Sequence, residues 1–233
     1  MPDNPILEVC CGSLQSAVNA VAGGAERIEL CSALEVDGLT PSMEVLRELR
    51  QRFPSLRIHV LIRPREGDFV YSEAEVARME REIHEAVVAG ATAIVSGALT
   101  ADSEVDMPAM KRLVEAADGL PFTFHRAFDV VKDQQVALET LKSLGIQRVL
   151  TSGGAATAEA GIPVLRRLVE QSKGEIIILP GGGVNNRNAC RILTETGATE
   201  IHGSCSEVLP NGERLTNADE VAAVLVAISK PLL

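Results

Sequence analysis

The chain has 233 residues, of which 46% are hydrophobic and 23% charged, and its 22 Lys and Arg against 32 Asp and Glu give a net charge of −10. An acidic chain without clustered basic residues excludes non-specific binding to nucleic acid or anionic lipid, and the apolar content excludes a disordered chain. No apolar stretch approaches the roughly 20 residues that cross a bilayer, and the N-terminus has no secretory leader pattern. We therefore expect a cytoplasmic protein that binds neither nucleic acid nor membrane, with five reduced cysteines and no disulfide framework.

Short apolar or β-branched runs alternate with segments of helical period along the whole chain. The expected strands are Ile6 to Cys10, Arg27 to Cys31, Arg57 to Ile62, Ala93 to Ser96, Phe122 to Ala127, Arg148 to Ser152, Ile176 to Leu179 and Glu200 to Gly203. The expected helices are Leu14 to Val21, Ser42 to Arg52, Glu73 to Val88, Pro108 to Ala117, Gln134 to Leu144, Ala160 to Gln171, Arg187 to Thr196 and Asp219 to Ile228.

A weak internal repeat places a glycine between a helix and the next strand at Gly24, Gly90, Gly145 and Gly197. Glycine at this position is typical of a left-handed helix stop. Eight strand and helix units without a linker predict an α/β protein with a single domain over residues 1–233, a closed (β/α)8 TIM barrel. The alternative is an open doubly wound sheet, but Cys11-Gly12-Ser13 stands where its G-x-G-x-x-G phosphate motif would lie.

Polar residues recur at every second position of several expected strands, so that they share the inner face of the barrel. Glu8, Arg27, Glu29, His59, His125 and His202 are of this kind. Barrel interiors are usually aliphatic and buried charges are costly, so a polar lumen indicates a functional site. The alternative is a purely structural ion-pair network in which Glu8 and Glu29 pair with Arg63 and Arg126.

The loops after strands three and five carry further chemistry. Arg63 and Arg65 flank Pro64, and paired guanidinium groups suit a carboxylate or phosphate. Phe69 and Tyr71 follow on the same loop as a substrate wall or a plain hydrophobic plug. His125 with Asp129 nearby is a candidate acid–base pair or a ligand held in one tautomer.

Glycine-rich segments follow strands six, seven and eight. In such barrels the last two loops frequently form a phosphate site from backbone N–H groups. The candidate anion-binding residues are Arg63, Arg65, Arg126, Ser152, Gly153, Gly182, Gly183, Gly203 and Ser204. The alternative is that the glycines only make tight turns.

Cys10 and Cys31 end the first two strands, which we expect to be neighbours about 4.8 Å apart. Two thiolates that close could clamp a soft ion such as Cu(I). Since the chain has no C-x-x-C motif, buried inert cysteines are the alternative.

Several motifs closely resemble the copper homeostasis protein CutC family. They include Leu7-Glu8-Val9-Cys10-Cys11, Arg27-Ile28-Glu29-Leu30-Cys31, Ile62-Arg63-Pro64-Arg65 and Thr123-Phe124-His125-Arg126-Ala127-Phe128-Asp129. The resemblance runs from about Ile6 to Ser204, and only Glu207 to Asn217 separates the last strand from the last helix, where members often carry a longer polar segment. It implies a cytoplasmic (β/α)8 barrel, often a homo-oligomer, that takes part in copper homeostasis, and it makes Cys10 and Cys31 the candidate Cu(I) ligands.

Two functional hypotheses follow. The resemblance implies a CutC-type protein with copper as its ligand. The residues themselves also fit a TIM-barrel enzyme acting on a small anionic or phosphorylated metabolite, and this leaves open whether the protein is an enzyme. The candidate catalytic residues for that alternative are His125, Asp129, Glu29, His59 and His202.

Overall fold

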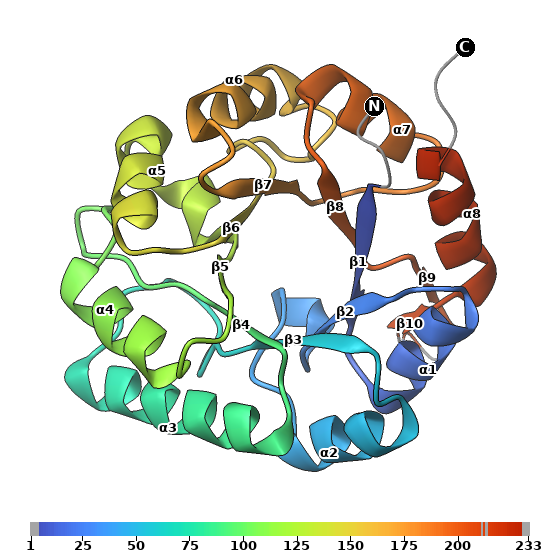
Figure 1. Ribbon diagram of the computed structural model, residues 1–233, viewed down its shortest axis with the longest axis horizontal. Coiled ribbons are helices and arrows are strands. Elements are labelled where there is room, and N and C mark those ends of the chain that lie inside the picture. The colour runs from blue at the N-terminus through green and yellow to red at the C-terminus, as the bar shows by residue number, and fades with distance from the viewer. Residues whose placement is uncertain (1–4, 211, 213, 230–233) are drawn as a thin grey trace.

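Eight parallel strands form one sheet that curves around a central axis (Figure 1). The computed structural model describes residues 5–210, 212 and 214–229. The strands are β1 (Ile6–Cys11), β2 (Arg27–Leu30), β3 (Arg57–Leu61), β4 (Ala93–Ser96), β5 (Phe122–Phe124), β6 (Arg148–Thr151), β7 (Ile177–Pro180) and β8 (Glu200–Gly203). Their order in the sheet is β7-β6-β5-β4-β3-β2-β1-β8, so that β1 lies between β2 and β8.

An outer ring of helices surrounds the strands (Figure 1). The helices are α1 (Leu14–Ala22), α2 (Met43–Arg52), α3 (Glu73–Ala89), α4 (Met107–Ala116), α5 (Gln134–Ser143), α6 (Ile162–Ser172), α7 (Ala189–Thr196) and α8 (Ala218–Ser229). The four glycines of the repeat all have positive φ angles, between 69° and 99°. The predicted left-handed positions between helix and strand are therefore confirmed.

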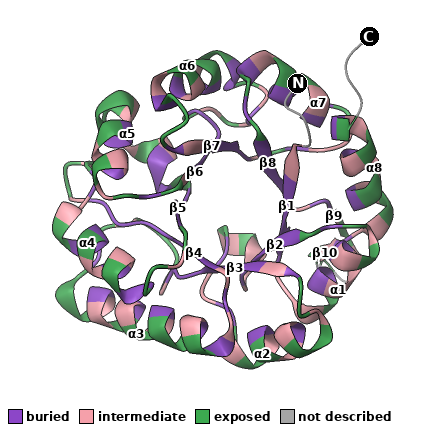
Figure 2. Cartoon of the chain, viewed as in Figure 1, coloured by how far each residue is buried: buried purple, intermediate pink, exposed green. Residues whose placement is uncertain are grey.

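The apolar core lies between the strands and the helix ring. Val9, Ile28, Ile58, Ile94 and Val149 are fully buried in it, each on the strand face opposite to the lumen. Figure 2 shows buried strands inside and helices exposed on their outer faces. Because successive strand residues alternate between two faces, the apolar residues cover the outside of the barrel and the polar ones are left for its interior.

The barrel is only nearly closed, which corrects the prediction of a closed one. β1 through β8 pair in continuous ladders except at one seam, where Gly181 and His202 form a single isolated bridge between β7 and β8. A side chain at Gly181 would place its Cβ 2.5 Å from Cδ1 of Leu150, so this position has no room for one.

Three irregular segments differ from the predicted elements. The fifth strand ends at Phe124, three residues early, because His125 caps a 3-10 turn, η2 (Arg126–Val130). A second 3-10 turn, η1 (Leu34–Val36), follows β2. The segment after β8 contains an antiparallel hairpin of β9 (Ser206–Val208) and β10 (Arg214–Thr216), which the sequence analysis did not predict.

No helix in the described residues is long and apolar enough to cross a membrane.

Candidate functional site

A buried carboxylate, Glu8, is the centre of the polar lumen. Its Oε2 lies 2.9 Å from Nε of Arg27 and 2.6 Å from Nδ1 of His59, and its Oε1 lies 3.0 Å from Nδ1 of His202. The strand register produces this geometry, because Glu8 pairs with His202 across β1 and β8. The expectation that strand polar residues share one inner face is borne out by these contacts.

The network extends across the lower end of the barrel. Nη2 of Arg27 lies 2.5 Å from Oε2 of Glu200, and Nε of Arg148 lies 2.9 Å from the same oxygen. The ion-pair network considered from the sequence therefore exists, but its predicted membership is wrong. The carboxylate of Glu8 pairs with Arg27 and two histidines, while Arg63 and Arg126 have other partners.

The charges of this network shift the ionisation of its members. Burial alone would raise the pKa of the Glu8 carboxyl. The charge of His59 and the hydrogen bonds from His202 and His59 outweigh that effect and lower the pKa to well below its usual value. Burial lowers the pKa of His202, but the Glu29 carboxylate and hydrogen bonds with Cys10 and Glu8 raise it more, to well above its usual value. Burial raises the pKa of Glu29 itself.

Cys10 and Cys31 lie side by side above this network. Their sulfur atoms are 3.7 Å apart, and the Cys10 thiol lies 3.4 Å from Oε1 of Glu29. One ligand atom from each of the three residues lies within 4.8 Å of the others, and all three side chains are buried. The predicted proximity of the two thiols is confirmed, because β1 and β2 are paired neighbours.

The environment of the Cys10 thiol favours its neutral form in the absence of a metal ion. The hydrogen bond with Cys31, burial and the Cys31 and Glu29 charges raise the pKa of Cys10 well above its usual value. Glu29 adds negative charge to the same site when it is ionised. A cation is therefore the partner that would allow the Cys10 thiol to ionise there.

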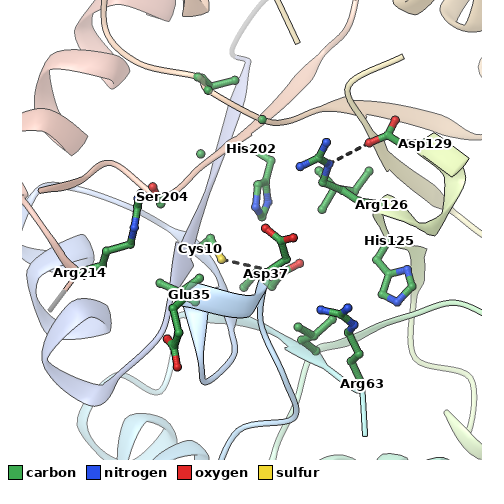
Figure 3. Close-up of a pocket in the computed structure, with 18 of the residues that line it drawn as sticks. Cys10, Glu35, Asp37, Arg63, His125, Arg126, Asp129, His202, Ser204 and Arg214 are labelled. Atoms are coloured by element: carbon green, nitrogen blue, oxygen red, sulfur yellow. Dashed lines mark hydrogen bonds and ion pairs between the residues drawn. The ribbon is translucent and has the colours of Figure 1, made fainter. Parts of the chain in front are cut away.

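A cavity of about 730 Å³ opens above the thiols at the carboxyl ends of the strands (Figure 3). Eleven of the candidate residues line it: Cys10, Glu29, Arg63, His125, Arg126, Asp129, Gly182, Gly183, His202, Gly203 and Ser204. The candidates that do not line it are Cys31, His59, Arg65, Ser152 and Gly153. Cys31 lies beside Cys10, and His59 lies beside Glu8, each in direct contact with its neighbour.

His125 and Asp129 both line the cavity, but they do not bond to each other in the described structure. Nδ1 of His125 accepts a hydrogen bond from the Ala127 N–H at 3.3 Å. Asp129 accepts from Nε of Arg126 at 2.8 Å and from the Thr151 hydroxyl at 2.5 Å. It also accepts from the backbone N–H groups of Ser152 and Gly154 in the loop after β6. The expected acid–base pair of His125 and Asp129 is therefore not formed.

His125 is held neutral. Burial and the nearby Arg63 cation lower its pKa to about 3. Its ring lies 4.8 Å from that of Phe69, centroid to centroid. Nε2 is buried and has no hydrogen-bond partner among the described residues.

The two arginines that flank Pro64 have different roles. Arg63 is buried and donates to the carbonyls of Val36, Gly38 and Gly67 at 2.7 to 3.1 Å, so that it joins the loops after β2 and β3. Arg65 lies outside the cavity and pairs with Glu75 at 2.6 Å and Asp68 at 2.9 Å. The sequence pattern could not separate these two roles.

Only some residues of the glycine-rich loops line the cavity. Gly182 and Gly183 after β7, with Gly203 and Ser204 at the end of β8, line the cavity. Ser152 instead donates its hydroxyl to the Ala155 carbonyl at 2.6 Å, and Gly153 lines a separate groove beside α5 and α6.

Sequence reasoning missed several residues of the cavity wall, among them Glu35 and Asp37 after β2 and Arg214 of the hairpin. They lie in short irregular segments without a periodic signal, so only the folded geometry brings them to the mouth.

An eight-stranded parallel α/β barrel with a polar cavity at the carboxyl ends of its strands places the chain in the TIM-barrel class. The CutC family model matches residues 5–207, and the chain belongs to the CutC family. This confirms the resemblance drawn from the motifs.

Relatives and solved structures support the same conclusion. The chain is 46% identical to the human copper homeostasis protein cutC homolog over 97% of this chain and 82% of that protein. It is 47% identical to the family protein CutC of Bacteroides fragilis over 92% of this chain and 85% of that protein. The crystal structure of a CutC protein from Streptococcus agalactiae matches with a TM-score of 0.82 and 36% identity, covering 86% of this chain and 98% of that chain.

A thiamine phosphate pyrophosphorylase from Pyrococcus furiosus matches with a TM-score of 0.63 and 17% identity, covering 97% of this chain and 96% of that chain, which shows the shared fold alone.

Proposed function

We propose that this protein takes part in copper homeostasis in the cytoplasm by binding Cu(I) between Cys10 and Cys31. The observation that carries the proposal is the pair of buried sulfur atoms 3.7 Å apart at the floor of the cavity. The family membership and the names of its relatives agree with this role.

The donor set fits a soft monovalent cation. Thiolate sulfur selects Cu(I) over harder ions, and the Glu29 carboxylate lies beside Cys10, where it adds negative charge when it is ionised. Arg27 is already neutralised by Glu8 and Glu200. An ion entering the cavity would meet Cys10 first, because Cys10 lines the cavity and Cys31 does not.

The requirement for reduced thiols supports the cytoplasmic location. Cys10 and Cys31 form no disulfide with each other, since their sulfur atoms are 3.7 Å apart. A disulfide between Cys10 and Cys31 would remove both proposed ligands, so the function needs a reducing compartment.

The alternative enzyme hypothesis has less support. It relied on acid–base chemistry by His125 with Asp129, but His125 is neutral and Asp129 bonds to other partners. Copper binding is therefore the function that we retain.

The test is anaerobic titration of the reduced protein with Cu(I) against a competing chelator. We expect saturable binding of one ion by the wild-type protein and its loss in Cys10→Ser, in Cys31→Ser and in the double variant. Cys190→Ser on α7 is the matched control and should bind like the wild type. Equal binding by the double variant and the wild type would contradict the proposal.

A further inference from the structure

The cavity is far larger than a metal ion requires. Its volume of about 730 Å³ lies within the range of roughly 300–1,000 Å³ found for small-molecule sites. Leu34, Leu61, Phe69, Leu150 and Val184 give it apolar walls. Such a space suits an organic body with a few polar groups, beyond any ion at the thiols.

One wall of the cavity carries a guanidinium group with free hydrogen-bonding capacity. Arg126 uses Nε for Asp129 at 2.8 Å and Nη2 for the Ser152 hydroxyl at 3.3 Å. Its Nη1 has no partner recorded within the described part of the chain, and the side chain is 43% exposed. Figure 3 shows the Arg126 side chain directed from η2 into the cavity.

The backbone after β7 faces the same space. A Cβ built on Gly182 would lie 3.7 Å from Cζ of Arg126, so the glycine backbone and the guanidinium group border one another. Gly182 and Gly183 have φ angles of 102° and 71°, a region that side chains disfavour. Their backbone N–H groups have no hydrogen bond to any residue that the structure describes.

Two buried side chains on the adjoining wall each have one nitrogen atom without a partner among the described residues. Nε2 of His125 and Nε of Arg63 are buried without a hydrogen bond among the described residues, and both residues are 5% exposed and line the cavity. Buried polar atoms in native proteins nearly always have a partner. Nε2 of His125 and Nε of Arg63 therefore lack the partner that buried polar atoms ordinarily have, in two residues that line the cavity.

We propose that the cavity binds a small organic molecule through an oxyanion group, a phosphate ester or a carboxylate, held between Arg126 and the backbone of Gly182 and Gly183. The apolar walls contact the rest of the molecule, and His125 and Arg63 contact its polar substituents. A guanidinium group with converging N–H donors is the arrangement that binds oxyanions in proteins. Cys10 lines the same cavity, but the residues that hold the oxyanion do not include the thiol pair, and this binding does not depend on copper.

The test is isothermal titration calorimetry of the metal-free, reduced protein with phenyl phosphate and, separately, with benzoate. Each probe joins an oxyanion to an apolar ring, and the two arms distinguish a phosphate site from a carboxylate site. We expect saturable binding of at least one probe. Arg126→Gln should weaken it about tenfold or more, since a hydrogen bond to a charged group contributes that much, and Arg126→Lys should restore part of the loss.

Arg65→Gln is the matched control, because Arg65 is an arginine of the same mouth region that pairs outside the cavity. It should bind the probes like the wild type. The double variant Cys10→Ser/Cys31→Ser should also keep probe binding, so that failure of the copper site and failure of the anion site are measured separately. Absence of binding by the wild type, wild-type affinity in Arg126→Gln, or loss of binding in the thiol variant would each overturn the proposal.

Discussion

At the residue scale, His125 shows how burial sets the state of a side chain that the sequence only marks as reactive. Its position at the end of a strand and its inward direction were predictable from the two-residue period of β5. Its neutral state was not, because that depends on the surrounding Phe69 ring and the Arg63 cation. Strand phase gives the face on which a residue lies, whereas partners depend on which loops fold over that face.

His125 makes the stability of the protein depend on pH. Its pKa is about 3 in the folded protein, below the ordinary histidine value near 6.5 of the unfolded chain. As the pH falls, the unfolded state therefore takes up a proton before the folded state does. The contribution of His125 to the unfolding free energy is fully present above about pH 6.5 and is lost as the pH falls toward 3. His125→Asn keeps an acceptor for the Ala127 N–H and cannot titrate.

Between pH 8 and pH 5 the wild type should lose about 2 kcal/mol more of its unfolding free energy than His125→Asn. Urea unfolding of both proteins at the two pH values measures the difference. Parallel pH profiles would show that the histidine is not the titrating group.

The roles of the two arginines also differ from the prediction, because strand phase does not show which partners a residue will have. Arg63 and Arg65 follow the same strand and looked equivalent in the sequence. The carbonyl groups that hold Arg63 come from Val36 and Gly38, in a loop about 25 residues earlier that has no periodic signal. The thiol pair was predictable because it needed only the neighbour relation of β1 and β2.

At the scale of elements, the backbone ladders join each strand only to its immediate neighbours, whereas the ion-pair network also connects strands that are not adjacent. Glu8 on β1 contacts Arg27 on β2, His59 on β3 and His202 on β8. Arg148 on β6 reaches Glu200 on β8, past the intervening β7. Five of the eight strands are therefore connected through side chains inside the lumen.

Removing the charge of Glu8 should destabilise the fold strongly. Glu8→Gln leaves Arg27 and His202 buried without their common anion, and breaking one partner of a buried pair costs about 3–5 kcal/mol. Urea denaturation gives the change in unfolding free energy. Glu26→Gln is the control, because Glu26 is 86% exposed and its contact with Arg57 should contribute under about 1 kcal/mol.

A loss for Glu8→Gln no larger than that of Glu26→Gln would mean that the network does not hold the strands together.

Strands and helices were predictable at nearly all positions, because each carries a clear apolar period. The exceptions were β5, which His125 ends early, and the hairpin of β9 and β10. Each strand of that hairpin has only three residues, too few for an alternating pattern to be recognised.

At the scale of the whole molecule, the seam between β7 and β8 is the weakest part of the barrel wall. Gly181 and His202 form its one bridge among the described residues, whereas β6 and β7 pair at four positions. Backbone groups along the seam are less protected from exchange with solvent.

Residue-resolved hydrogen exchange should detect this difference. Amide protons of β7 and β8 that face the seam should exchange about tenfold faster than those between β1 and β2, which corresponds to ~1.4 kcal/mol in opening free energy. Equal protection at the β7–β8 seam and between β1 and β2 would show that the barrel is uniformly closed. The sequence could not predict the seam, since it depends on the stagger between the seventh and eighth strands.

The place of the seam has a mechanical consequence for the cavity. The loop of Gly182 and Gly183 continues from β7, whereas His202 belongs to β8, which is laddered to the thiol-bearing strands. The β7 end and β8 are thus joined directly by one bridge. In the other direction around the barrel, continuous ladders join them through β1 to β6. We therefore expect the barrel to resist deformation more strongly around the laddered strands than at this seam, where a wider mouth would disrupt one bridge and no strand ladder.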